Sequence, residues 1–492
     1  MKIYKYILPV LIFTMLSCNE FLTEQPYSIV APNSFFKTKS DFNGAVVGAY
    51  TLLMTPQLYS WYYPNTLVGI TYETRIPTTF GEYTLGIDAS YTYTQTTWTS
   101  FYAVINQCNL TLEKLLGAEI DEDAKNVFKG ELLFLRGMVY FDLNRLYGGV
   151  PLHLTPSEAI EDLSLPRSSV EECYNQIILD LQDAENLLPV VNPFEKGRAS
   201  KGSAAGLLAK VYLTMAGKPL EDVTKLQLAH NKLIEIIDIN DPSKSNQPYI
   251  YHLEADYQNL FIVSTARLIP VVSKYADENG PESVFEINFK GLTDGTPAAI
   301  FPHASSFNGR AASTWLYNMY DNVDYRKDVA FCKIGDPYGS KSTQRKFPRS
   351  GSLWNNHENN WYYLRYADLV LMLAEVENEL HGPTNVALNA INAIRKRARN
   401  AGGTSVNTPA DYTTNTASTQ ETLRALIYKE RQLEFAVEGH AWFDWQRTGR
   451  IKEIVEMQNV PGRVYKPAIE LFPLPIQEIT LSKGVLLQNK GY

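Results

Sequence analysis

Apolar residues that recur every three or four positions constrain this 492-residue chain more than any other feature of its sequence. The clearest run lies between Phe128 and Leu146, and Gly148-Gly149-Val150-Pro151 ends it. Residues at this spacing fall on one face of an α-helix, and such a face has to be buried. The sequence therefore predicts a helix here that packs one apolar face against its neighbours.

Further segments show the same periodicity and predict a mainly α-helical chain. The helix from Val170 to Leu188 has a predicted capping box at Ser168 and Glu171. Segment 199–216 is rich in Ala and Gly, which lets neighbouring helices approach closely. Other helices are predicted over 364–374, over 387–398 and from Ser418 to Val437. Helix pairs of this length suggest a superhelical scaffold of tetratricopeptide-like pairs, although no strict repeat of about 34 residues is present.

Three smaller patterns refine this prediction. Residues 284–289 alternate in polarity and predict a strand. Glu430 lies on an apolar helix stripe, so we expect Arg365, Arg447 or another arginine to pair with it, as a structural ion pair rather than a catalytic acid. The basic run 395–399 is interpreted as a solvated helix end that complements the helix dipole, with an anion site as the alternative.

The N-terminus has the layout of a secretory signal. Lys2 and Lys5 precede an apolar run over 7–16, which is too short to span a bilayer. The pair Ser17-Cys18 resembles the lipobox of bacterial lipoproteins, where the signal peptide is cut before a cysteine that receives lipid. We therefore expect a signal peptide over 1–17 and lipidation of Cys18. An ordinary cleaved signal and a buried N-terminal helix are the alternatives.

The rest of the chain limits the function classes that remain. No later apolar run reaches membrane-spanning length, so lipid alone is expected to hold the body at a membrane. The formal net charge of −8 excludes the basic footprint of a nucleic-acid-binding protein. Cys108, Cys173 and Cys332 are scattered without CxxC spacing, which indicates buried free thiols rather than a disulfide framework or a zinc site.

The chain contains no Gly/Ser-rich or Pro-rich linker that would separate independent cores. We expect a tether over 18–32, followed by a single helical body over 33–492. The N-terminal part of this body covers about 33–217, and its C-terminal part covers about 270–492.

An aromatic-rich stretch is the first candidate for a ligand-binding surface. Twelve of the 44 residues from Tyr59 to Tyr102 are aromatic, about 27% against 12% for the whole chain. Flat rings can stack on the apolar faces of sugars, while hydroxyl and charged groups bond sugar hydroxyls. The alternative is that these rings pack against the helices. We expect core packing to be favoured for Trp98, Phe101 and Tyr102. The candidate ligand residues from this stretch are Tyr72, Glu73, Arg75, Tyr83 and Trp98.

A second stretch, from Gly291 to Tyr320, begins as a loop of small residues and ends in aromatic ones. Loops of this length inside a compact body are usually either functional or disordered. Trp315 and Tyr317 are therefore candidates for the other wall of a ligand-binding surface, and anchoring of the loop is the alternative. A third aromatic patch, 354–363, is predicted to lead into the following helix.

No catalytic constellation can be assigned. A glycoside hydrolase needs two carboxylates at a defined separation, and the helical glutamates are interpreted as exposed or paired groups: Glu131, Glu375, Glu434 and Glu438. After His357-Glu358, Trp361 stands where the zinc motif HExxH requires its second histidine. We therefore predict a protein that is not an enzyme, with no catalytic residue, no metal site and no cofactor.

Eight ordered motifs lie along nearly the whole chain. They are FLTEQP (Phe21 to Pro26), ELLFLRGMVYFDLNRLYGGVPL (Glu131 to Leu152), GRASKGSAAGLLAKVYL (Gly197 to Leu213), LRYADLVLMLAEVENEL (Leu364 to Leu380), INAIRKRA (Ile391 to Ala398), ERQLEFAVEGHAWFDWQRTGR (Glu430 to Arg450), PLPIQEI (Pro473 to Ile479) and the terminal QNKGY. With the lipobox, they resemble the SusD/RagB-like family of nutrient-binding lipoproteins of bacterial outer membranes. Ala441 and Lys490 are minor departures, standing where the family often has Arg and Pro.

This resemblance implies a helical scaffold with few short strands and an irregular, loop-rich, ligand-facing half. It also implies a partner, a SusC-like TonB-dependent transporter, and a lipid-anchored, surface-exposed place on the bacterial outer membrane. The predicted function is non-catalytic binding of oligosaccharides or polysaccharides for import. A peptide-binding member of the family and a helical-repeat scaffold without a small ligand are the alternatives. The family's motifs do not include its ligand residues, so the seven candidates rest on composition alone.

Overall fold

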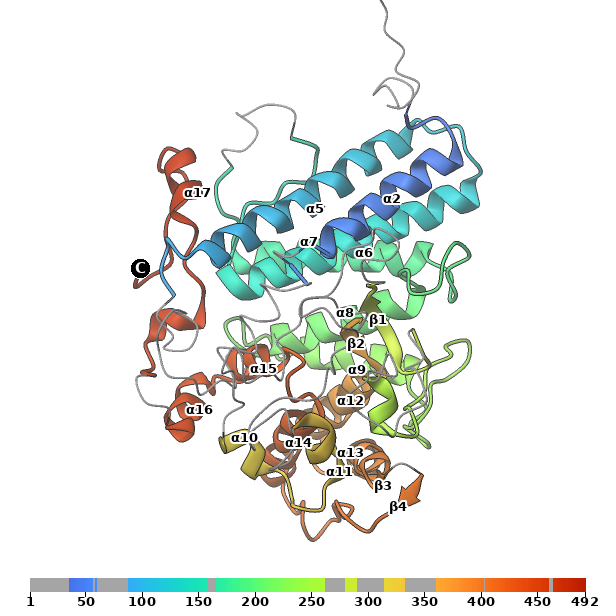
Figure 1. The fold of residues 1–492 in the computed structure, drawn as a ribbon, viewed down its shortest axis with the longest axis vertical. Helices are drawn as coiled ribbons and strands as arrows, with labels where there is room; N and C mark the ends of the chain where they lie inside the picture. Colours follow the sequence, from blue (N-terminus) through green and yellow to red (C-terminus); the bar gives the residue numbers. More distant parts are fainter. Residues whose placement is uncertain are drawn as a thin grey trace, which may run out of the picture.

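The computed structural model describes residues 35–55, 58–59, 87–157, 165–261, 279–289, 314–331, 360–401, 403–459 and 463–492 (Figure 1). These residues form fourteen α-helices, two 3-10 helices and four short strands, so the predicted mainly helical fold is confirmed. In chain order the elements are α2 (Lys39–Leu53), α5 (Thr92–Leu116), α6 (Glu122–Tyr147), α7 (Val170–Leu187), α8 (Lys201–Ala216), α9 (Lys225–Ile236), η3 (Tyr257–Leu260), β1 (Ser283–Ile287), α10 (Thr314–Met319), α11 (Tyr325–Ala330), β2 (Trp361–Arg365), α12 (Tyr366–His381), α13 (Asn385–Ala398), β3 (Asn400–Ala401), β4 (Thr404–Ser405), α14 (Gln420–Glu434), α15 (Ala441–Arg447), α16 (Ile451–Gln458), η4 (Pro467–Glu470) and α17 (Ile476–Leu481).

The long helices pack one on the next in a continuous stack. Helices α2, α5, α6 and α7 form one end of the body, α8 and α9 its middle, and α12, α13 and α14 the other end (Figure 1). Each helix in this series contacts its successor. Helix α9 contacts α12 directly, although η3, β1, α10, α11 and β2 lie between them in the sequence. The stack buries one apolar core that runs from the N-terminal helices to the C-terminal ones.

Helix α6 is the most deeply buried element of the stack. Its first turn is capped by Asp121, and Gly148, with φ of 76°, follows its last residue. Every residue from 130 to 147 is buried, so the predicted burial of its apolar face is confirmed and extends to the other faces of the helix. The polar residues on its other faces have partners: Arg136 donates to both carboxylate oxygens of Asp180 in α7, at 2.8 and 2.7 Å.

The start of α7 differs from the predicted one by a single residue. The Ser169 hydroxyl accepts a hydrogen bond from the backbone N–H of Glu172, and the Glu172 carboxylate accepts one from the N–H of Ser169. The predicted pair was Ser168 and Glu171. A capping box is therefore present at the start of α7, one residue later than predicted. The predicted helices over 199–216 and 387–398 are confirmed as α8 and α13.

Helix α14 also begins later than predicted. Thr419, not Ser418, accepts the capping hydrogen bond, which the backbone N–H of Thr422 donates. The helix ends at Glu434, and Val437 lies beyond it with a positive φ of 67°, so the predicted helical stripe was three residues too long.

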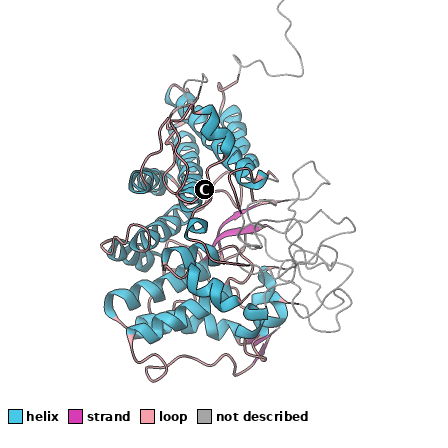
Figure 2. Ribbon diagram, turned by 90° about the vertical axis from the view of Figure 1, so that its left-hand side faces the viewer, coloured by secondary structure: helices cyan, strands magenta, loops and turns pink. Residues whose placement is uncertain are grey.

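Strands β1 and β2 form an antiparallel ribbon that the sequence predicted only in part. The predicted strand over 284–289 is confirmed as β1. Its partner β2 covers 361–365, where a lead-in to a helix was predicted, and it pairs Leu364 with Phe285 and Tyr362 with Glu286. In Figure 2 the ribbon lies at the edge of the helical stack.

The guanidinium of Arg365, at the junction of β2 and α12, is fully buried among three carboxylates. Its Nε donates to Glu438 at 2.8 Å, and its Nη1 lies 2.5 Å from Glu282 and 3.1 Å from Glu434. Burial by itself would lower the pKa of Arg365, but these carboxylates raise it well above its usual value. The ion group connects β1, the start of α12 and the C-terminal end of α14.

Neighbouring arginines extend this group. Arg397 of α13 binds Glu282 and Glu434, while Arg326 of α11 and Arg395 of α13 bind Glu430 at 2.6 and 2.7 Å. The predicted structural ion pair of Glu430 is thus confirmed, with arginines other than the two named in advance. The prediction of a solvated basic helix end was wrong for Arg395 and Arg397, because both are buried against these carboxylates. We call Arg326, Arg365, Arg395, Arg397 and their carboxylates Asp324, Glu282, Glu430, Glu434 and Glu438 the buried ion group.

Two of the predicted free thiols are described. Cys108 and Cys173 are buried and unbridged, which confirms the prediction for them, and Cys332 lies outside the described residues. Burial raises the pKa of Cys108 to about 12 and that of Cys173 to about 11, so neither thiol is reactive at neutral pH. Within the described helices, none combines the length and the apolar character needed to cross a membrane.

Replacement of Arg365 by Ala should lower the free energy of unfolding by about 3–5 kcal/mol, because it leaves buried carboxylates without a cation. Arg424→Ala is the matched control, since Arg424 makes a similar bidentate pair with Glu379 at the surface. The control should lose less than about 1 kcal/mol. Urea unfolding followed by circular dichroism measures both, and equal losses would contradict a special role for the buried ion group.

Candidate ligand-binding site

Most of the candidate ligand residues from the aromatic stretch cannot be placed. Tyr72, Glu73, Arg75 and Tyr83 lie outside the described residues, as does the lipidation candidate Cys18. The structure places the other three candidates, one on α5 and two on α10.

Trp98 is a core residue. It is 3% exposed, and its ring packs edge-on against Tyr147 of α6, with 4.9 Å between the ring centroids, and against Tyr102 at 5.1 Å. Burial raises the pKa of Glu478 in α17, and a hydrogen bond from Trp98 partly offsets this rise. Trp98 therefore joins three helices, and Phe101 is buried beside it as expected.

Trp315 and Tyr317 lie on the short helix α10 and point to different neighbours. Trp315 packs against Trp445 of α15, with ring centroids 6.2 Å apart. Tyr317 packs against Phe331 at 5.6 Å, and the Lys327 ammonium lies 4.1 Å from the centre of its ring. Residues two positions apart do not share a helix face, so these two rings do not form one continuous wall. Both keep part of their surface exposed.

Around the β-ribbon lie described residues that are next in sequence to stretches outside the described part of the chain. Tyr59 packs on Tyr363, Phe261 packs on Tyr362, and the backbone N–H of Phe289 donates to the Asn360 side chain at 2.8 Å. These residues immediately precede positions 60, 262 and 290, and Asn360 immediately follows position 359. We call Tyr59, Phe261, Phe289, Asn360, Tyr362 and Tyr363 the ribbon platform. Residues 60–86, which include four of the candidate ligand residues, follow Tyr59 in the sequence and lie outside the described residues.

A small polar cavity lies behind the ribbon. It has a volume of about 40 Å³, and its lining includes Tyr59, Tyr363, Lys210 and His440. Burial, together with the Lys210 ammonium 3.1 Å away, lowers the pKa of His440 to about 3, so this imidazole is neutral. The cavity has room for ordered water and is too small for a sugar ring. It belongs to the support of the ribbon and does not provide a ligand site.

A larger, open groove lies at the other end of the body. Its volume is about 700 Å³, and it runs between residues 240–255, α13 and the β3–β4 hairpin. Among the residues that the structure describes, its lining contains no aromatic ring. The amide and charged groups of the lining are Asn240, Asp241, Glu254, Asn389, Asn392, Lys396, Arg397, Asn400 and Asp411. The groove can hydrogen-bond sugar hydroxyls but offers no plane for stacking. Sequence reasoning missed it, although the asparagines of α13 and of the residues after it were a visible signal.

The helical glutamates that a hydrolase would need are engaged elsewhere. Glu131 pairs with Arg198, Glu375 pairs with Arg447, and Glu434 and Glu438 belong to the buried ion group. Their predicted structural roles as paired groups are confirmed.

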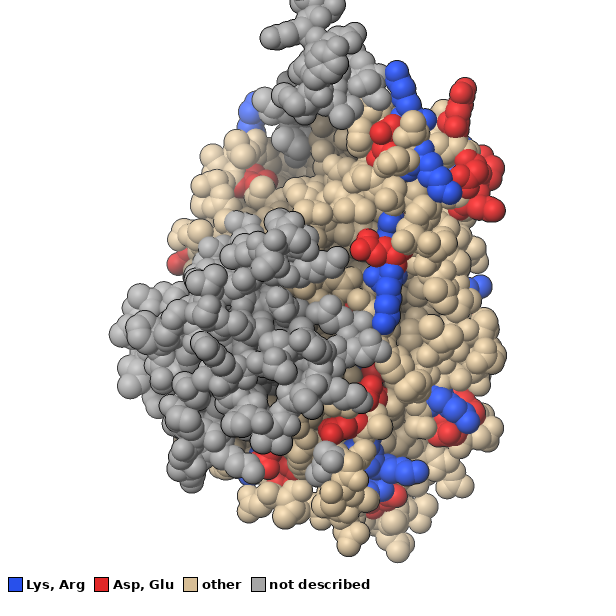
Figure 3. Space-filling model, turned by 45° about the vertical axis from the view of Figure 1, so that its right-hand side comes forward, with Lys and Arg blue, Asp and Glu red and all other residues tan. Residues whose placement is uncertain are grey.

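On the face shown in Figure 3, cationic and anionic side chains of the described residues lie beside one another.

Comparisons with known proteins identify a family and full-length relatives that this chain resembles in sequence. A family model described as "Starch-binding associating with outer membrane" matches residues 20–213, and the model of the SusD family matches residues 298–492. Two SusD-like proteins of Formosa agariphila, P25 and P2, are 29% and 27% identical to this chain, and each match covers 100% of both chains.

Solved structures show the same fold. A SusD homolog from Bacteroides thetaiotaomicron superposes with a TM-score of 0.75 at 23% identity, covering 93% of this chain and 98% of that one. A laminarin-binding SusD-like protein gives a TM-score of 0.72 at 24% identity, covering 93% of this chain and 100% of the other. The two family models, which together cover most of the chain, and the full-length relatives establish that this chain belongs to the SusD/RagB family, whose members are non-catalytic binding proteins and whose description places them at the outer membrane.

Proposed function

We propose that this protein binds oligosaccharides or polysaccharides at the outer membrane without altering them and delivers them to a SusC-like, TonB-dependent transporter. The observation that carries the proposal is the match of residues 20–213 to a family model described as starch-binding and associated with the outer membrane. A solved relative of the same fold is laminarin-binding, which favours glycans over peptides as ligands. Peptide binding and a pure scaffold role are outcomes that the test below distinguishes.

The ribbon platform supports this proposal by its position. It connects directly to the aromatic-rich stretch that carries Tyr72, Glu73, Arg75 and Tyr83. Aromatic rings with nearby hydroxyl and charged groups are suited to sugars, because rings stack on the apolar sugar faces while polar groups fix the hydroxyls. We assign these four residues to ligand contact, with Trp315 and Tyr317 as further contacts, and Trp98 to the core.

The rigidity of the platform also favours a binding role. Tyr362 and Tyr363 lie on β2, which the buried ion group fixes to the helical stack through Arg365. The platform residues are buried, so their role is to hold a neighbouring ligand surface in place. A surface that is held in place before binding loses less conformational freedom when the ligand arrives. Such a surface can bind weakly ordered polymers such as glycans without a large conformational change.

We further propose that the chain is held at the cell surface by lipid on Cys18. Residues 18–32 would then act as a tether between the acyl chains and a single body over 33–492. One acyl chain gives only marginal membrane binding, so stable anchoring needs more than one chain on the cysteine. A tether leaves the body free to move as a lid over its transporter.

Isothermal titration against a panel of polysaccharides and oligosaccharides, including starch and laminarin, tests the central proposal. At least one glycan should bind with one saturable transition, and chromatography of the mixture should show an unchanged ligand. Release of smaller oligosaccharides would contradict non-catalytic binding. Heat of binding with peptides but with no glycan would favour a peptide ligand. No heat of binding with either would favour a scaffold.

Two aromatic replacements should separate ligand contact from core packing. Trp98→Ala should lower the free energy of unfolding by about 3–5 kcal/mol, because it opens a cavity among α5, α6 and α17. The affinity of the folded protein should stay unchanged. Tyr72→Ala should have the opposite profile, with affinity reduced at least tenfold and stability changed by less than about 1 kcal/mol. Titration and urea unfolding measure both quantities, and a reversed pattern would show that the site assignment is wrong.

Cys18→Ala should move the protein from the membrane fraction to the soluble fraction when cells are fractionated, since the mature chain would lack its lipid. Affinity for the glycan should not change, because the anchor lies outside the proposed ligand surface. Ser17→Ala keeps a small residue before the cysteine and serves as the control that stays on the membrane. Retention of the Cys18→Ala protein on membranes would argue for a different mode of attachment.

A further inference from the structure

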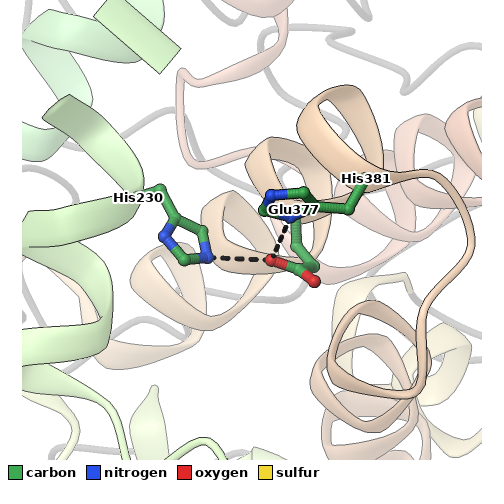
Figure 4. A group of neighbouring side chains, drawn as sticks. All are labelled: His230, Glu377 and His381. Atoms are coloured by element: carbon green, nitrogen blue, oxygen red, sulfur yellow. Dashed lines mark hydrogen bonds and ion pairs between the residues drawn. The ribbon is translucent and has the colours of Figure 1, made fainter. Parts of the chain in front are cut away.

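Three side chains of types that bind metal ions meet at the junction of α9 and α12 (Figure 4). His230 Nε2 lies 2.8 Å from Oε2 of Glu377, and His381 Nδ1 lies 3.1 Å from the same oxygen. The ligand atoms of the three residues all lie within 4.8 Å of one another. Figure 4 shows Glu377 between the two imidazoles, with His230 reaching across from the neighbouring helix.

The fold places these residues together for simple geometric reasons. Glu377 and His381 are four positions apart on α12, so they lie on the same face of that helix. Helix α9 packs against α12 and carries His230 to the same point. The hydroxyl of Thr384 donates to the second oxygen of Glu377 at 2.8 Å, which fixes the orientation of the carboxylate.

We propose that His230, Glu377 and His381 bind one divalent transition-metal ion of the Zn²⁺ class and thereby clamp α9 to α12. Two imidazoles and one carboxylate are ligands that suit such ions, and three protein ligands with an open position form a recurrent arrangement. Mg²⁺ and Ca²⁺ prefer all-oxygen sites and do not match this set.

The distances agree with a site that closes around the ion. At Zn–N bonds of about 2.0–2.1 Å, neighbouring ligand atoms of a tetrahedral site lie about 3.3 Å apart, close to the two observed distances from Glu377. The two histidine nitrogens have to approach each other further. The side chain of His381 is 48% exposed at the C-terminal end of α12, so it can rotate towards the ion. Its exposure also gives the ion a path from solvent and leaves room for a water ligand.

The hydrogen bond from Thr384 adds a feature typical of metal sites. Groups that orient a ligating side chain usually contribute to metal affinity, and here the orienting residue is also the N-cap of α13. The ion would connect α9, α12 and the start of α13. It would hold the C-terminal end of α12, and the N-terminal end of this helix follows Arg365 of the buried ion group. This role is structural and separate from the proposed glycan surface.

The test uses the full chain without a histidine tag, stripped with EDTA and dialysed against ZnCl₂. Equilibrium dialysis with metal analysis should give one Zn²⁺ per chain. Co²⁺ should replace it and show the visible absorption of a tetrahedral site with nitrogen ligands. His381→Ala and His230→Ala should each reduce Zn²⁺ affinity at least tenfold, and Zn²⁺ should raise the melting temperature of the wild type but not of these two variants.

His252→Ala is the matched control, because His252 is exposed and lies outside the cluster. Its Zn²⁺ affinity should equal that of the wild type. Should His230→Ala fail to fold, the half-exposed His381 still allows the decision by its own replacement. Absence of a stoichiometric ion, or equal Zn²⁺ binding by wild type and His381→Ala, would overturn the proposal and leave a hydrogen-bonded His–Glu–His group.

Discussion

The buried guanidinium of Arg365 is the interaction on which the rest of the structure depends. It lies where β2 ends and α12 begins. Its partners are the carboxylates of Glu282, just before β1, of Glu434, the last residue of α14, and of Glu438. Charges without water are costly, so each member of this group needs all its partners. The ribbon and the C-terminal helices therefore cannot be displaced from one another without exposing or separating several buried charges.

A second set of buried charges lies along α12 itself. Asp368 binds Lys210 of α8 and Arg431 of α14, and Arg447 of α15 binds Glu375. Burial raises the pKa of Asp368, but the adjacent cations lower it further, so the carboxyl stays ionised. Helix α12 is thus fixed by ion pairs at its start, through Arg365, and along its length, through Asp368 and Glu375. These ion pairs link α12 to α8, α14 and α15.

Helical periodicity was sufficient to predict most of the stack, because apolar stripes such as the one in α6 report directly on burial. Helix starts were less certain for a local reason. The run Ser168-Ser169-Val170-Glu171-Glu172 fits a capping box in either of two registers, and only packing selects the second. The basic run of α13 was misread because its partners Glu282 and Glu430 come from distant parts of the sequence.

Ligand residues were harder to predict than helices. Composition identifies a stretch rich in rings, but it cannot tell a stacking ring from a core ring, and Trp98 proved to be the latter. The metal-ligating cluster was invisible for another reason, since His230 lies far in sequence from Glu377 and His381 and matches no short motif. Only the packing of α9 on α12 brings these side chains together.

Hydrogen exchange of the full chain, measured by mass spectrometry with and without a bound glycan, tests the central claim most directly. The account predicts that protection rises in peptides from 60–86 and 314–320 and at the ribbon, while α6, α7 and α8 stay unchanged as a preformed base. Protection centred instead on α13 and residues 240–255, or spread through the helical stack, would contradict it.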